Sequence, residues 1–444
     1  MSNLIFILIF LIGYSCIALE YRLRVDKAAI SLLMFGVIWS VYACLDGASV
    51  GETLIFHLGS SCETLVFLIG AMTIIEIIDS HGGFSFVTEH ITTRNKRRLL
   101  WVLAAITFVL SAMLDNMTTA IVLIMMLRRV VPQGNERLLY ASVVVIAANC
   151  GGAWSPIGDV STIMLWMRGN VTTLRLILFL FLPCVVSLLV PTLLLSCRMV
   201  KGESFAATED DGKSMPEGVG KRFSRVVLML GIAGLLFAPI FKALTGLPPY
   251  VGVMMSLGVL WVFTEWFYER RLSVPEEHKN RVSKLLRRID MSTILFLLGV
   301  LMSVAGLQSS GVLSAAAHVL DSTVHEVFAI SAIIGLLSSV IDNVSLVAAC
   351  MGMYPVLDVA EVVVGADPVY MQAFVQDGIF WLLLAYCAGV GGSMLIIGSA
   401  AGVVVMGLEK INLAWYLRYI TPVMLLGYLA GIAIIFMEWE FLVV

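Results

Sequence analysis

Two Asp-Asn pairs interrupt long apolar segments of the sequence. Asp115-Asn116 lies within "SAMLDNMTTAIVLIMM", and Asp342-Asn343 lies within "SSVIDNVSLVAACMGM". A carboxylate is costly to bury in an apolar environment, so an ionisable group in such a segment is a functional candidate by default. Carboxylate and amide oxygens are hard ligands, which suit an alkali cation or a proton better than a soft transition metal. The two pairs therefore predict a site that binds a cation or protons.

Two other apolar segments are broken by small and polar residues: "NCGGAWSPIGDVST" (Asn149–Thr162) and "GVGGSMLIIGSAAG" (Gly389–Gly402). Such breaks supply helix ends, unpaired carbonyls and hydroxyl groups, and they are tolerated at membrane depth only where they line protein or a water-filled cavity. We expect the breaks and the pairs to meet, which brings together Asp115, Asn116, Thr118, Asn149, Asp159, Ser161, Thr162, Asp342, Asn343, Ser345, Ser393 and Ser399.

The elements that position these residues follow from the composition. Hydrophobic residues make up 60% of the 444 and charged residues 13%, against roughly 45–50% and 25% in soluble domains. The apolar residues form many runs separated by short polar stretches, which is typical of a polytopic α-helical membrane protein. The first run lacks a basic leader and a cleavage site, so it is expected to remain as a span. The eight Cys are scattered and are expected to be free thiols. The predicted segments are Leu4–Leu19, Ala28–Leu45, Thr64–Ile78, Leu99–Val131, Leu138–Met167, Leu174–Cys197, Val226–Leu244, Tyr250–Tyr268, Met291–Ser310, Val324–Val356, Ile379–Leu408 and Ile411–Phe436.

The chain contains an internal repeat. "TLVFLIG" matches "TILFLLG", "LDNMTTA" matches "IDNVSLV", and "GGAWSPIGD" matches "GGSMLIIGS", in the same order in both halves. A polar stretch separates the halves. The predicted organisation is a first repeat at 1–200, a cytoplasmic linker at 201–224 and a second repeat at 225–444.

Cation placement predicts the orientation of the segments. All but Arg168, Arg175 and Lys242 of the 28 Lys and Arg fall in six loops, which the positive-inside rule places in the cytoplasm. Segment 99–131 then enters and leaves on the cytoplasmic side, and 324–356 enters and leaves outside. Each arm of about 15 residues spans roughly 22 Å as helix, less than a hydrocarbon core. We therefore predict an all-α polytopic membrane protein of two inverted-topology repeats, with about ten spans, two opposed re-entrant hairpins and two broken helices.

At these motifs the sequence resembles the NhaD-type sodium/proton antiporters of the ion transporter (ArsB/NhaD) superfamily, over essentially the whole chain. The motifs that carry the resemblance are "SAMLDNMTTA", "NCGGAWSPIGDVST", "SSVIDNVSLVAA" and "GVGGSMLIIGSAAGVVVMG". The resemblance implies secondary active export of Na⁺ (or Li⁺) in exchange for protons by alternating access, in pH homeostasis. It also implies a homodimer in the bacterial inner membrane, with no cofactor other than the transported ions.

The resemblance further implies which residues bind the ions. The cation- and proton-binding set becomes Asp115, Asn116, Thr118, Asn149, Asp159, Ser161, Thr162, Ser338, Asp342, Asn343, Ser393 and Ser399, with Na⁺ at Asp115, Asn116, Asp342 and Asn343. Glu63 and Glu76 are candidates for a proton path. Two positions depart from the family pattern: Ser161 stands where Thr is usual, and Ser345 where Pro is common.

Other interpretations of the same residues stay open. The three Asp could simply cap helices, because Asp and Asn cap well. The chain could instead carry a small anion, such as a dicarboxylate or oxyanion, coupled to Na⁺ or H⁺, although the acidic tips would repel it. The sequence lacks motifs for nucleotide binding or proteolysis, so we expect neither an enzyme nor a partner of nucleotides or nucleic acid.

Overall fold

The computed structural model describes residues 2–18, 24–46, 50–83, 95–132, 134–197, 221–269, 281–324, 326–340, 342–358 and 367–442. These residues form two compact units, each of which is considered by itself. Unit 1 comprises Met1–His57, Thr93–Ala207 and Gly299–Val444, and unit 2 comprises Leu58–Thr92 and Thr208–Leu298. Over the described ranges every regular element is a helix, apart from an isolated bridge between Leu357 and Val375. The all-α prediction is confirmed.

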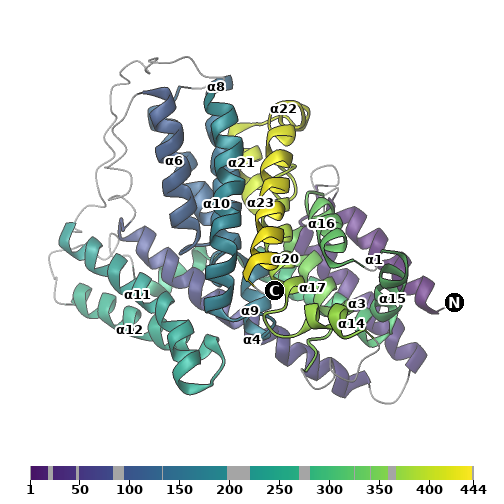
Figure 1. Ribbon diagram of the computed structural model, residues 1–444. Coiled ribbons are helices and arrows are strands. Elements are labelled where there is room, and N and C mark those ends of the chain that lie inside the picture. Colours follow the sequence, from purple (N-terminus) through teal and green to yellow (C-terminus); the bar gives the residue numbers. More distant parts are fainter. Residues whose placement is uncertain are drawn as a thin grey trace. The chain divides into compact units, whose positions relative to one another are not determined.

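Unit 1 contains most of the helices (Figure 1). They are α1 (Ser2–Ala18), α3 (Lys27–Asp46), the start of α4 (Val50–Ser80), α6 (Lys96–Ser111), α7 (Asn116–Val130), α8 (Asn135–Ala153), α9 (Val160–Met167), α10 (Thr173–Cys197), most of α14 (Met291–Ser309), α15 (Val312–Thr323), α16 (Val327–Ser338), α17 (Asn343–Met353), α19 (Pro368–Met371), α20 (Ile379–Gly391), α21 (Ala400–Glu409), α22 (Leu413–Tyr419) and α23 (Thr421–Leu442).

Unit 2 consists of the rest of α4, α11 (Lys221–Thr245), α12 (Pro249–Glu269), the short α13 (Val282–Leu285) and the first residues of α14. Helices α11 and α12 pack against each other. Among the described residues, seven helices are long and apolar enough to cross a membrane: α3, α4, α10, α11, α12, α14 and α23.

Several predicted boundaries were wrong. Helix α4 begins at Val50, so the stretch read as a loop up to Glu63 is helical. Helix α11 begins at Lys221, inside the predicted linker, whose residues 201–220 lie outside the described ranges. The last predicted segment, Ile411–Phe436, consists of two helices, and α21 and α22 are bent by 113° to each other. Helix α15 was not predicted.

The four predicted interruptions are confirmed. Helices α6 and α7 form a short pair that turns at Asp115, and α16 and α17 form a second pair that turns at Asp342. Helices α8 and α9 are separated by a break, as are α20 and α21. Both halves thus order these elements in the same way: a short helix pair followed by a broken helix.

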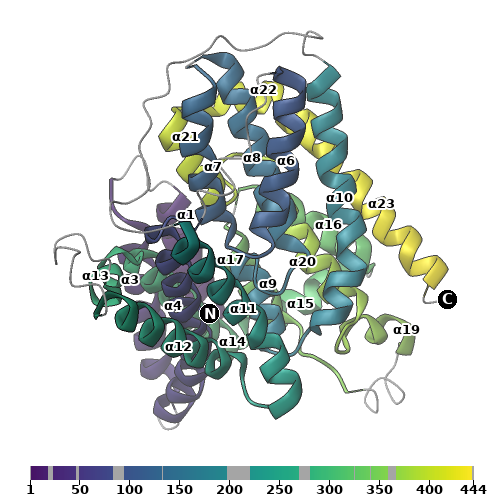
Figure 2. The ribbon, with the colours of Figure 1, turned by 90° about the vertical axis from the view of Figure 1, so that its left-hand side faces the viewer.

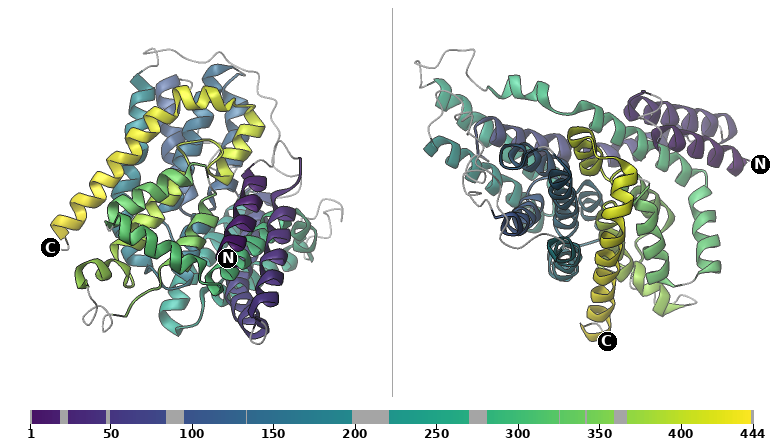
Figure 3. Two further views of the ribbon diagram at one scale, coloured as in Figure 1. Left: turned by 90° about the vertical axis from the view of Figure 1, so that its right-hand side faces the viewer. Right: turned by 90° about the horizontal axis from the view of Figure 1, so that it is seen from above.

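The hairpins lie on opposite sides of the breaks. Helix α7 packs against α8 and α21, whereas α17 packs against α9 and α20. Figure 2 shows α6, α7 and α21 in its upper part, with α17, α20 and α9 below them. In the right-hand view of Figure 3, from above, α6, α8 and α10 are seen nearly end-on, and α23 runs beside α10. The arrangement fits the prediction of opposed hairpins.

Equivalent hydroxyl groups fix both hairpins to the broken helices. The Ser111 hydroxyl of α6 donates to Ala148 O of α8 at 2.6 Å. The Ser338 hydroxyl of α16 donates to Ala388 O of α20 at 2.7 Å. The residues correspond under the sequence repeat, so the repeat extends to individual hydrogen bonds.

Equivalent glycines allow the backbones to touch. A Cβ atom on Gly151 would lie 2.3 Å from Phe108 O, and one on Gly391 would lie 2.4 Å from Gly335 O. Both distances are far below a van der Waals contact, so a side chain at either position would push the hairpin away. The glycines of the sequence motifs therefore serve close helix packing in both halves.

Candidate cation site

Each polar break places an N-cap residue at the start of a helix. Asp115 has extended backbone torsions and accepts a hydrogen bond from Thr118 N–H at 2.9 Å, which starts α7. The Thr118 hydroxyl donates to the other oxygen of the same carboxylate. This is the usual reason why Asp begins a helix. The capping interpretation of Asp115 is therefore correct as far as local structure goes.

Asp159 also caps a helix, but it does more. Its Oδ1 accepts from the N–H and the hydroxyl of Ser161, both at 2.9 Å, at the start of α9. The side chain of Thr162 bonds to the Asp159 carbonyl at 2.8 Å. Helix α9 therefore directs its N-terminal end, which carries a partial positive charge, at the Asp159 carboxylate.

The two hairpin tips meet at Asp159. Asn116 Nδ2, at the first tip, donates to Asp159 Oδ2 at 2.7 Å. Asn343 Nδ2, at the second tip, donates to Oδ1 at 3.1 Å and to Oδ2 at 3.0 Å. One carboxylate thus accepts from equivalent Asn residues of both repeats. It is the centre of the polar cluster.

Asn149 extends the cluster to the second broken helix. Its Oδ1 accepts from Asn116 Nδ2 at 3.1 Å, and its Nδ2 donates to the hydroxyls of Ser393 at 2.9 Å and Ser399 at 2.8 Å. Ser399 stands where the repeat has Asp159, and it caps α21 through Gly402 N–H at 3.1 Å. The second repeat therefore contributes a hydroxyl where the first contributes a carboxylate.

Within the described part of the chain, the side chains that bond Asp159 are all uncharged, so none of them balances its charge. Asp159 is 1% exposed, and the groups that bond its carboxylate are two Asn amides and the N–H and hydroxyl of Ser161. A buried carboxylate is costly unless it is paired, protonated or bound to a metal ion. The site can accordingly hold a proton or a cation in turn, and it suits an ion with hard oxygen ligands.

The other two predicted carboxylates do not bond to Asp159. Asp342 N–H donates to the Tyr14 hydroxyl at 3.0 Å, while Asp342 Oδ2 is buried without a hydrogen-bond partner. The hydrogen bonds of Asp115 to other described residues both lie within its own cap. The predicted placement of Na⁺ at Asp115, Asn116, Asp342 and Asn343 remains a prediction, and the structure adds Asp159 as the residue that joins the two Asn.

The remaining predicted residues fall into two groups. Ser338 lies beside the site but bonds a carbonyl of α20, so it fixes the hairpin. Glu63 and Glu76 belong to unit 2, where Glu63 is exposed and Glu76 Oε1 accepts from Ser80 and from Arg288 at 3.3 Å. Their role in a proton path remains a prediction.

Sequence reasoning missed three residues around the site. Ser111 is the repeat equivalent of Ser338, so the alignment of the halves could have identified it. Tyr14 contacts the second tip, and the Tyr416 hydroxyl donates to Ser393 O at 2.9 Å. Neither tyrosine lies in a motif, because both come from helices outside the breaks.

Comparison with known proteins gives a consistent family. The model of the family described as "Citrate transporter" matches residues 6–375. The chain is 45% identical to "Sodium/proton antiporter 1" of Arabidopsis thaliana over 96% of its length and 71% of that protein, and 42% identical to "Sodium/proton antiporter 2" over 96% and 97%. It is 32% identical to "Na(+)/H(+) antiporter NhaD" of Vibrio cholerae over 96% of the chain and 90% of that protein.

The fold also resembles that of a solved transporter. The YdaH transporter of Alcanivorax borkumensis, described as having an unusual topology, superposes with a TM-score of 0.55 over 99% of this chain and 98% of its own. The identity is 11%, so this similarity concerns the fold.

Proposed function

We propose that this chain, which belongs to the citrate transporter family and to the NhaD-type sodium/proton antiporters, exports Na⁺ or Li⁺ in exchange for protons by alternating access. The protein is a multi-pass membrane transporter and not an enzyme. The proposal includes a bacterial plasma membrane and a homodimer, as the sequence resemblance implies.

The central observation in support is the buried Asp159 carboxylate shared by Asn116 and Asn343. A proton on Asp159 removes its charge. A Na⁺ ion does the same, but it cannot approach an oxygen through an amide N–H. Rotating an Asn amide by half a turn replaces its N–H₂ with its oxygen, which is a cation ligand. Proton and Na⁺ therefore exclude each other at Asp159, and exchange follows from that exclusion.

Charge distribution within unit 1 supports the orientation of the site in the membrane. We call the end at which α6 and α8 begin and α7 and α21 end the basic pole; it carries Lys96, Arg97, Arg98, Arg128, Arg137 and Lys410. Two acidic residues, Glu136 and Glu409, also lie at this pole. The opposite end carries Glu326, Asp367 and Asp377 together with Arg168 and Arg175, so it lacks the excess of cations. The positive-inside rule assigns the basic pole to the cytoplasm. Na⁺ would then be loaded from that side.

The alternative cargo is a small anion, as the description of the family model suggests. A site for an anionic substrate normally offers cationic side chains or several free helix N-termini. At this site the helix N-termini of α7 and α9 are already occupied by the carboxylates of Asp115 and Asp159. The charges at the site thus favour a cation.

The test is a flux assay in reconstituted vesicles. With a pH gradient imposed, Na⁺ or Li⁺ should dissipate the gradient, whereas citrate should not. The Na⁺ concentration for half-maximal flux should rise as pH falls over about two units, a span that largely titrates a competing carboxylate. Citrate-dependent flux without Na⁺-dependent proton movement would replace the cation proposal with the anion one.

The matched variants are Asp159→Asn and Ser142→Ala. Asn keeps the size of Asp159 and can still cap α9, but it cannot bind a proton or balance the charge of a cation. Na⁺-dependent proton flux should therefore fall below about one-hundredth of the wild-type flux. Such a loss exceeds the roughly 10–100-fold effect that is typical of residues that contact a metal ligand but not the metal itself. The Ser142 hydroxyl donates to the Leu138 carbonyl of its own helix at 2.8 Å and takes no part in the site described above, so its variant should keep normal flux. Full flux in Asp159→Asn would disprove the role of Asp159.

A further inference from the structure

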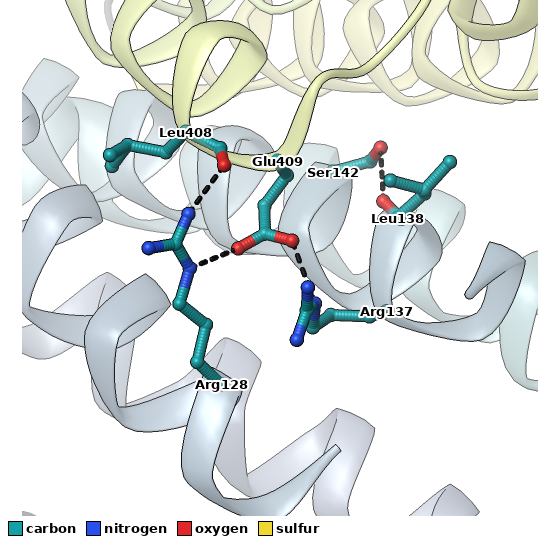
Figure 4. Close-up of polar contacts among 6 residues, drawn as sticks. All are labelled: Arg128, Arg137, Leu138, Ser142, Leu408 and Glu409. Carbon is teal, nitrogen blue, oxygen red and sulfur yellow. Dashed lines mark hydrogen bonds and ion pairs between the residues drawn. The ribbon is translucent and has the colours of Figure 1, made fainter. Parts of the chain in front are cut away.

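A buried carboxylate joins three helices at the basic pole. The Oε1 atom of Glu409, the last residue of α21, accepts from Arg128 Nε at 2.7 Å, and its Oε2 accepts from Arg137 Nε at 2.7 Å. The Glu409 side chain is 1% exposed, that of Arg137 is 13% exposed and that of Arg128 is 40% exposed. Figure 4 shows the carboxylate between the two guanidinium groups. We call Glu409, Arg128 and Arg137 the Glu409 clamp.

Arg128 makes a second contact with α21. Its Nη2 donates to the carbonyl of Leu408, one of the last carbonyls of that helix. A cation at a helix C-terminus is favourable, because the unpaired carbonyls there carry partial negative charge. The end of α21 is therefore held by both a side chain and its backbone.

The same three helices meet again at the cation site. Asn116 begins α7, Asn149 lies in α8 and Ser399 caps α21, and they are linked through the Asn149 amide. Twelve residues separate Asn116 from Arg128 and Arg137 from Asn149, or about 18 Å of helix, and ten residues, or about 15 Å, separate Ser399 from Glu409. Each helix has one end in the site and the other in the clamp.

We propose that the Glu409 clamp is a positioning element for the cation site: it holds α7, α8 and α21 as one body, and thereby sets the position of Asn116 and Asn149 around Asp159. The proposal rests on the proposed function where it uses Na⁺ affinity as a measure. Its structural part does not depend on which ion is carried.

The energetics favour a positioning role. Two guanidinium groups around one buried carboxylate are sensitive to geometry, and removing one member leaves charges unpaired. Helices in a membrane lack the strong hydrophobic force that would otherwise hold them together. An ion pair at the far end therefore limits how far the helices can slide or splay at the near end.

The test compares Glu409→Gln with Glu136→Gln. Glu136 precedes Arg137 on α8 and pairs with Lys96 of α6 at 2.6 Å, with 50% of its side chain exposed. Both variants thus remove an acidic partner at the same pole, but only Glu409 belongs to α21 and ties that helix to α7 and α8. Because changes along a coupled network alter coupling by roughly 2- to 30-fold, Glu409→Gln should raise the half-saturating Na⁺ concentration about fivefold or more. Glu136→Gln should leave it within about twofold.

Hydrogen exchange supplies a measure that does not require transport. Amides in the first turns of α7 and α21 should exchange faster in Glu409→Gln than in Glu136→Gln, because those turns carry the site. Arg137→Gln and Arg128→Gln each remove one arm of the clamp, and they give the same comparison if Glu409→Gln does not fold.

The outcomes separate the two proposals. Faster amide hydrogen exchange at the site, together with a raised half-saturating Na⁺ concentration, supports the clamp. Faster amide hydrogen exchange in a protein whose wild type carries no Na⁺ supports the clamp and overturns the proposed function. If amide hydrogen exchange and the half-saturating Na⁺ concentration are both unchanged, or if only the maximal rate falls, the clamp is overturned and Na⁺/H⁺ antiport stands.

Discussion

The two hairpin tips contain the same kinds of residue at equivalent positions, but the hydrogen bonds of their polar side chains differ. At the first tip, both oxygens of Asp115 are bonded to Thr118. At the second tip, the equivalent atoms, Asp342 Oδ2 and the Ser345 hydroxyl, are buried and unpaired. A cavity of about 260 Å³, lined in part by Tyr14 and Ser345, adjoins the second tip.

The difference separates two roles that the sequence could not distinguish. The first tip is a finished helix cap, whose hydrogen bonds account for its carboxylate. The second tip retains a buried acceptor and a buried hydroxyl, each of which costs about 1–3 kcal/mol while unpaired. Such a group is expected where an ion or proton binds in another state of the protein. The second tip should therefore depend more on its charge than the first.

The largest effect should come from exchanging Asp for Asn at each tip. If both carboxylates bind the ion, as the sequence resemblance implies, either change should abolish exchange, whereas the structure predicts an asymmetry. Asp342→Asn should lower Na⁺-dependent proton flux below about one-hundredth of the wild-type flux. Replacing an ion ligand should cost more than the roughly 10–100-fold that is typical of residues around the ligands. Asp115→Asn should stay within about tenfold, because Asn caps a helix about as well as Asp. Equal losses in vesicles with matched protein content would contradict the asymmetry.

A smaller effect should appear in stability. Thr118→Ala removes the hydroxyl that donates to the second oxygen of Asp115 but keeps the backbone N–H that caps α7. The loss of that one hydrogen bond should lower the free energy of unfolding by about 1 kcal/mol. Ser345→Ala removes an unpaired hydroxyl and should be neutral or slightly stabilising. Thermal unfolding in detergent without Na⁺ measures both variants. A loss in Ser345→Ala as large as that in Thr118→Ala would show that the second tip is also a closed cap.

The smallest difference is expected between Ser111→Ala and Ser338→Ala. Each removes one buried hydrogen bond from a hairpin to a broken helix, at 2.6 and 2.7 Å, and each should cost about 1 kcal/mol. The two values, from the same unfolding measurement, should agree within about 0.5 kcal/mol. A clear inequality would mean that the repeats differ in more than their tips.

The sequence predicted the parts of the site that depend on local pattern. Asp115 and Asp159 cap helices, as the alternative interpretation of the sequence allowed, and Ser399 does so as well, which was not predicted from the sequence. The repeat in the sequence also predicted that both Asn would reach one place. It could not show that they share Asp159, because this depends on how α9 is oriented between the hairpins.

Long-range pairing explains what the sequence did not reveal. Glu409 follows an apolar run and precedes Lys410, so it reads as the edge of a basic loop. Its partners are more than 270 residues away in the sequence. Likewise, helix α4 begins at Val50 and not near Thr64. Its start was predicted too late because Glu52 and Glu63 lower the mean hydropathy of a stretch that is nevertheless helical.

Among the described residues, no cationic side chain bonds the Asp159 carboxylate, and this has an electrical consequence for the proposed cycle. If the body carrying the site crosses the membrane empty and deprotonated, it moves one negative charge through the field, which involves about 2.3 kcal/mol per 100 mV. A carboxylate that holds Na⁺ or a proton moves no charge at this residue. In a cell that is negative inside, the voltage thus opposes the inward return of the bare carboxylate, and it favours a return in which Na⁺ or a proton occupies the site.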